Sequence, residues 1–147
     1  MADLDDVRDF LADEHGLAVV STTQADGRVL SSVVNCGVTT HPVTGEATVA
    51  LVSRGGAARL AHVRRGSEVT VAAQRSWRWV AVTGACDLIG PDDPTDGIEG
   101  DRLRLLLREV FQAAGGTHDD WDEYDRVMAE DRRCCMFIDP GRIIGQV

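Results

Sequence analysis

The chain begins with apolar residues at helical spacing and continues with short apolar segments separated by turns. Leu4, Val7, Phe10 and Leu11 predict an amphipathic helix over residues 3–14. The next segments are rich in Val, Ser and Thr and are joined by short turns, one of them containing Asp-Gly. They predict three strands of an antiparallel meander, Leu17–Thr23, Val29–Thr39 and Glu46–Val52.

The rest of the chain mixes helices and strands. A short helix is expected over Ala57–Arg65, followed by strands over Val69–Gln74 and Trp77–Ile89 and a Pro- and Asp-rich loop. Apolar residues between 103 and 111 predict a second helix that ends at Gly115-Gly116. Thr117, with Asp120 three residues later, fits a capping box that opens a third helix. The last predicted strand is Cys134–Ile138.

Six strands with helices inserted late predict a mainly β protein, a closed or nearly closed antiparallel barrel with helices packed outside. We expect the first and last strands to pair, which would remove exposed edges. A length of 147 residues is typical of one domain, so residues 1–147 are expected to form a single unit.

Charge separates one segment from the rest of the chain. The net charge is −9, without any Lys, which argues against general nucleic-acid binding. Residues 54–78, however, contain six Arg and one acid, a net +5, so the remainder carries −14. Carboxylates from elsewhere in the fold, or a bound anion, would each explain this basic segment. No apolar run is long enough for a membrane helix, and the acidic N-terminus differs from a secretion signal, so we expect a cytoplasmic location.

The sequence lacks the usual signatures of several enzyme classes. It has no G-x-G-x-x-G, Walker or G-x-S-x-G motif, which argues against a Rossmann, P-loop or α/β-hydrolase fold. Cys36, Cys86, Cys134 and Cys135 do not form C-x-x-C pairs and the His residues lack zinc spacing, so no metal is expected. Free buried thiols are the interpretation for these cysteines.

One segment combines groups that bind anions. Arg54 follows a predicted strand, Gly55 and Gly56 allow close backbone approach, and a short helix then begins. Arg59 and His62 are three residues apart and share a helix face with Arg65, and an Arg fork suits phosphate. A surface helix after a glycine turn would show the same pattern, and spacing alone does not separate the two.

Aromatic and polar residues on two strands offer further candidates. Trp77 and Trp79 are two apart, so a strand would direct both rings to one side, either into the core or against a planar ligand. Ser31, Ser32 and Asn35 interrupt an apolar strand. They either mark its outward face or donate hydrogen bonds to a heterocycle.

Several of these segments together resemble a known family. The helix with Arg59 and His62-Val63-Arg64-Arg65, and the strand with Trp77-x-Trp79 and Thr83-Gly84, resemble split β-barrel proteins of the pyridoxamine 5′-phosphate oxidase-like superfamily. The segment His118–Tyr124, with Met128 and Asp131-Arg132-Arg133, is similar to its actinobacterial deazaflavin branch, which binds coenzyme F420. The resemblance spans about residues 5–145.

The resemblance implies a homodimer with cofactor sites at the subunit interface and a small-molecule substrate. The cofactor phosphate would lie at Arg59, where the family more often has Lys, and near His62, where it often has Asn. The ring would lie against the second strand. The implied cofactor-binding residues are Ser32, Asn35, Arg54, Arg59, His62, Arg64, Trp77 and Trp79.

The implied activity is an F420-dependent reductase that transfers hydride from the deazaflavin ring and needs no protein nucleophile. The alternatives are an FMN-dependent oxidoreductase and a non-catalytic flavin or tetrapyrrole carrier on the same fold. F420 has a phosphodiester and an oligoglutamate tail and is a longer polyanion than FMN. A basic segment that extends to Arg64, Arg65 and Arg78 therefore favours F420.

Overall fold

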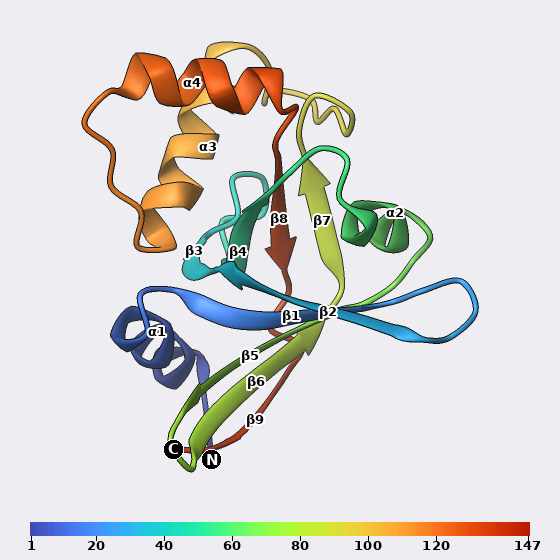
Figure 1. The fold of residues 1–147 in the computed structure, drawn as a ribbon, viewed down its shortest axis with the longest axis vertical. Helices are drawn as coiled ribbons and strands as arrows, with labels where there is room; N and C mark the ends of the chain where they lie inside the picture. The colour runs from blue at the N-terminus through green and yellow to red at the C-terminus, as the bar shows by residue number, and fades with distance from the viewer.

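A computed structural model describes the whole chain, residues 1–147, and contains four helices and nine strands (Figure 1). The helices are α1 (Leu4–Asp13), α2 (Ala58–Arg64), α3 (Asp101–Ala113) and α4 (Trp121–Glu130). The strands are β1 (Leu17–Thr23), β2 (Val29–Asn35), β3 (Gly37–Thr40), β4 (Ala47–Ser53), β5 (Val69–Arg75), β6 (Arg78–Gly84), β7 (Cys86–Ile89), β8 (Cys134–Ile138) and β9 (Arg142–Gln146). None of the helices is both long and apolar enough to cross a lipid bilayer.

The strands form two antiparallel sheets, ordered β2-β1-β5-β6-β9 and β3-β4-β8-β7. The two longest predicted strands, Val29–Thr39 and Trp77–Ile89, each divide between the two sheets. The first becomes β2 and β3, and the second becomes β6 and β7. The bends lie at Cys36-Gly37 and Gly84-Ala85, where the backbone approaches a neighbouring segment closely. A Cβ atom on Gly37 would overlap the Ala113 carbonyl, and one on Gly84 would overlap the Asp139 carbonyl.

The expected pairing of the first and last strands is wrong. β1 pairs with β2 and β5, whereas β8 pairs with β4 and β7. The bends carry the chain from one sheet to the other, so β1 and β8 belong to different sheets. A ninth strand, β9, was not predicted because it is short and contains Gly145; it pairs with β6.

The cap of α4 also differs from the expectation. The helix begins at Trp121, and the Asp120 carboxylate accepts a hydrogen bond from the Glu123 amide at 3.2 Å. Asp120 therefore caps the helix in place of Thr117. Both residues are good caps by type. The chain through 117–119 lies outside the helix, which leaves the capping position to Asp120.

Two apolar clusters hold the fold together. The larger joins the inner faces of both sheets to α1 and α2 and includes Phe10, Val20, Leu60 and Met136. The second lies between the other face of the four-stranded sheet and helices α3 and α4, which lie together in Figure 1. The four cysteines are free thiols, and burial raises the pKa of Cys36 and of Cys134 to about 12.

Candidate functional site

Arg59 joins the two sheets at the edge formed by β2. From the first turn of α2, its Nη2 donates to the Ser32 hydroxyl at 2.9 Å and its Nη1 donates to the Ser53 hydroxyl at 3.0 Å. Burial lowers the pKa of Arg59, the thiol of Cys36 opposes this shift, and the positive charge of Arg133 lowers the pKa further. No carboxylate forms an ion pair with this guanidinium. Arg59 is therefore a partly buried cation with spare donors and an unneutralised charge.

The glycine segment before α2 is fixed on one side and open on the other. The Gly55 amide donates to the Asp131 carbonyl at 3.1 Å, and a Cβ atom on Gly55 would overlap the backbone of Asp131 and Arg132. Gly56 has no atom within 4 Å of the equivalent position. The segment is thus held against the corner between α4 and β8, and the side chain of Arg54 remains exposed.

A cavity of about 450 Å³ is lined by residues close in the chain to Ser32 and Ser53, the two partners of Arg59, although Arg59 itself does not line it. Ser32 is two residues from Val34 on the same side of β2, about 7 Å along the strand, and Ser53 directly follows Val52. Both valines line the cavity. The full lining comes from β2, β4, the end of α3, α4 and the start of β8, and consists of Val33, Val34, Asn35, Val52, Phe111, Ala114, Gly115, Gly116, Tyr124, Met128 and Arg133.

The lining is apolar except at two positions that can still form hydrogen bonds. The Arg133 guanidinium is the one charged lining group; it donates to Asp131 at 3.1 Å through Nη2, which leaves Nη1 free. The Asn35 amide donates to the His15 carbonyl at 2.9 Å, which leaves its oxygen free. Tyr124 donates its hydroxyl to the Leu107 carbonyl at 2.9 Å, and burial raises the pKa of this phenol. Tyr124 therefore offers the cavity a neutral ring stacked on Phe111, with ring centroids 4.8 Å apart.

The structure brings some of the predicted residues together and separates others. Ser32 and Arg59 contact each other next to the cavity, Asn35 lies on its wall, and Arg54 is exposed outside its lining. Ser32 and Asn35 point to opposite sides of β2, as the odd spacing requires. His62 is buried against β1, where its Nδ1 lies 2.8 Å from the Thr22 hydroxyl.

The basic segment does not form one continuous track. Arg64 makes a bidentate pair with Asp93, with contacts of 2.9 and 2.6 Å, and this hydrogen bonding raises the pKa of Arg64. Arg75 pairs with Asp13, and the Arg78 guanidinium lies over the Phe10 ring at 5.6 Å. Carboxylates from elsewhere in the fold thus neutralise two of the six arginines. The expected extension of an anion site to Arg64 and Arg78 is not supported by their positions.

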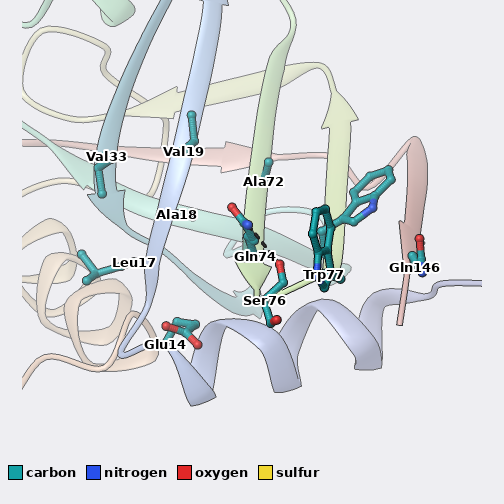
Figure 2. Close-up of a pocket in the computed structure, with 12 residues that line it drawn as sticks. Glu14, Leu17, Ala18, Val19, Val33, Ala72, Gln74, Ser76, Trp77 and Gln146 are labelled. Atoms are coloured by element: carbon teal, nitrogen blue, oxygen red, sulfur yellow. Dashed lines mark hydrogen bonds between the residues drawn. The ribbon is translucent and has the colours of Figure 1, made fainter.

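The two tryptophans lie away from Arg59. Trp77 belongs to the β5–β6 turn and is 87% exposed, and Trp79 is 37% exposed on the outer face of the five-stranded sheet. Leu17, Val19 and Val33 lie on that face and line a shallow cavity of about 640 Å³ together with Trp77 and Trp79 (Figure 2). Neither ring is in the core, so the core-packing interpretation of these residues is wrong.

Sequence reasoning missed Ser53 and gave no role to Arg133 or Tyr124. Ser53 is a single polar residue at the end of an apolar strand, and only its contact with Arg59 gives it a role. Arg133 and Tyr124 fall in segments that carried the family resemblance. Their place in the cavity depends on how α4 packs on the sheet.

The solved structures that are similar to this chain are similar to it over most of its length. No protein-family model matches the chain. The structure is similar to the conserved hypothetical protein Rv2991 from Mycobacterium tuberculosis, with a TM-score of 0.69, 15% identity, and coverage of 99% of this chain and 85% of that chain. It is also similar to a pyridoxamine 5′-phosphate oxidase-related, FMN-binding protein from Nostoc punctiforme, with a TM-score of 0.64, 12% identity, and coverage of 99% and 86%.

A third similar structure is described as an F420 reductase, with a TM-score of 0.58, 11% identity, and coverage of 87% of this chain and 88% of that chain. Identities this low establish the fold alone. Together with the antiparallel sheets and the four helices, they show that the chain has the split-barrel fold of pyridoxamine 5′-phosphate oxidase-like proteins.

Proposed function

We propose that the protein is an F420-dependent reductase that binds the cofactor phosphate at Arg59 and the deazaflavin ring in the neighbouring cavity. The observation that carries this proposal is a partly buried guanidinium held by two hydroxyls, without a carboxylate, near an apolar cavity. Such a group stabilises a bound phosphate because its charge is not already compensated. The likeness of the fold to FMN-binding proteins and to an F420 reductase agrees with a flavin-type cofactor.

The surroundings of Arg59 favour a phosphodiester over a terminal phosphate. F420 continues beyond its phosphate into a charged tail, so its site must open to solvent there. Arg54 is exposed and Gly56 borders open space, so neither closes this end of the site. FMN ends at its phosphate and would leave Arg54 unused. FMN remains the second candidate, because one of the similar structures is described as FMN-binding.

The chain itself would bind and orient the cofactor. The deazaflavin, when bound, supplies a hydride from its ring carbon, and the protein contributes position and electrostatics. Val34, Val52 and Met128 offer an apolar wall that would exclude water from the ring. The free Nη1 of Arg133 would donate to a ring oxygen.

We propose a homodimer in which a second copy covers the outer face of the five-stranded sheet. That face carries Leu17, Val19 and Ile144 at 50%, 42% and 42% exposure, with Val33 at 62% on the same face. Burial of such residues is favourable by about 25 cal/mol per Å². Val33 also lines the cavity beside Arg59, so a partner on this face would close the open side of the site.

Titration of the purified protein with F420 and with FMN, followed by fluorescence quenching, tests the proposed cofactor. We expect tighter binding of F420, and Arg59→Ala should weaken it by about 1.5–3 kcal/mol, the range for hydrogen bonds to charged groups. Arg64→Ala is the matched control, since it removes an arginine that already pairs with Asp93. Equal losses in the two variants, or binding of neither cofactor, would contradict the proposal.

A further inference from the structure

A polar pocket of about 600 Å³ lies at the end of α2 opposite Arg59. The β1–β2 hairpin forms one side and the loop from α2 to β5 forms the other. Arg59 and Arg65 are six residues apart, about 9 Å along the helix axis, so this pocket is separate from the cavity that lies beside Arg59. Its lining has one apolar residue among eight, namely Thr23, Gln24, Ala25, His62, Arg65, Gly66, Ser67 and Glu68.

His62 offers the pocket a ring nitrogen that nothing in the protein uses. The residue is only 7% exposed, and its Nδ1 lies 2.8 Å from the Thr22 hydroxyl. Nε2 has no partner in the chain. No fully buried side-chain nitrogen or oxygen lacks a hydrogen bond, so Nε2 must reach the pocket that His62 lines. The Thr22 hydroxyl can donate to Nδ1, and in that tautomer the ring proton lies on Nε2.

Arg65 provides a cation at the same place. It is exposed and, unlike its neighbour Arg64, has no carboxylate within ion-pair distance. Ser67 holds the loop in position, because its hydroxyl accepts from the Thr23 amide at 2.9 Å and donates to the Glu68 carbonyl at 2.6 Å. Glu68 is the single acid in the lining and forms no ion pair with Arg65. In the tautomer with the proton on Nε2, the buried imidazole N–H and the free guanidinium suit a carboxylate, which accepts from both.

We propose that this pocket binds a carboxylate group. Two sources share this chemistry. One is a free dicarboxylate, and the other is a glutamate of the F420 tail. The second source rests on the proposed function, because the tail would have to start from a phosphate at Arg59. In either case Arg65 and His62 donate to the ligand and Glu68 opposes it.

The experiment follows the imidazole resonances of His62 by NMR while glutarate and γ-glutamylglutamate are added to the protein without cofactor. We expect saturable shifts of His62. Arg65→Gln should weaken the apparent affinity at least fivefold, Glu68→Gln should strengthen it, and Arg64→Gln should leave it unchanged. The glutarate result does not depend on whether the protein binds F420, so the two proposals fail separately.

A second arm identifies the source by comparing the affinity for F420 with that for its tail-less form. A loss in Arg65→Gln confined to the tailed cofactor supports the tail as ligand. Binding of glutarate with no effect of Arg65→Gln on F420 supports a free dicarboxylate. If no probe shifts His62 and Arg65→Gln leaves F420 binding unchanged, or if Arg64→Gln lowers affinity as much as Arg65→Gln, the proposal is overturned.

Discussion

Gly55 and Gly56 are adjacent, but only Gly55 is packed closely against another segment. Substituting each of them therefore tests the geometry of the site. A Cβ atom on Gly55 would overlap backbone atoms of Asp131 and Arg132, which have no flexible end that could yield. The Gly55 amide would also lose its 3.1 Å hydrogen bond to the Asp131 carbonyl if the segment moved. Overpacking costs about 1–3 kcal/mol and a lost hydrogen bond about 0.5–1.5 kcal/mol, so Gly55→Ala should destabilise the protein by about 1.5–4.5 kcal/mol.

Gly56→Ala is the control, because its Cβ would meet open space and its backbone is not left-handed. We expect it to be neutral or to stabilise the protein by about 0.4–1 kcal/mol through the unfolded chain. Urea denaturation measures both variants, and the midpoint reports the difference when the slope is unchanged. Gly55→Ala should also weaken cofactor binding, because the displaced segment carries Arg54. Equal stability of the two variants would refute the packing of this segment against the corner between α4 and β8.

Three further outcomes are expected. Val19→Arg should convert the proposed dimer to a monomer in sedimentation velocity, whereas Val43→Arg, on a turn elsewhere, should not; two dimeric variants would count against this interface. Arg108 and Arg104 hold the pKa of Asp125 below its usual value, so their stabilisation is present above about pH 4 and is lost as the pH falls through the lowered pKa. Asp125→Asn should therefore flatten the acid limb of stability, measured by urea unfolding from pH 6 to 3, and an unchanged limb would exclude this role. Added salt should weaken F420 binding more than FMN binding, since screening acts over about 10 Å at 0.1 M salt; a flat response would argue against a tail held by charge.

Arg59 and Arg64 belong to the same basic segment but have different partners, two hydroxyls for Arg59 and a carboxylate for Arg64. A net charge of +5 over residues 54–78 did not distinguish arginines that meet a carboxylate from those that do not. Asp93 and Asp13 neutralise Arg64 and Arg75 from distant parts of the chain. The proposals use Arg54, Arg59 and Arg65, which have no carboxylate partner. Charge counted along the sequence therefore overestimates the extent of an anion site.

Local pattern was sufficient for most of the elements. The strands Leu17–Thr23 and Cys134–Ile138 have the predicted bounds, and α1 and α2 agree to within a residue or two at each end. The bends at Gly37 and Gly84 were not predictable, because they depend on close approaches to Ala113 and Asp139, which are far away in the sequence. These bends decide which strands pair, so the number of sheets and their order also lay beyond local pattern.

The sequence by itself determined a mainly β chain with an Arg-Gly-Gly segment before a short helix, because helix and strand periods and glycine frequency are local properties. It also indicated Ser32 and Arg59 as candidates. Only the tertiary structure placed Ser32 and Ser53 on one guanidinium, left Trp77 and Trp79 outside the core, and paired Arg64 with Asp93. Each of these contacts joins residues from separate elements, and its energy exists only after the sheets have packed together.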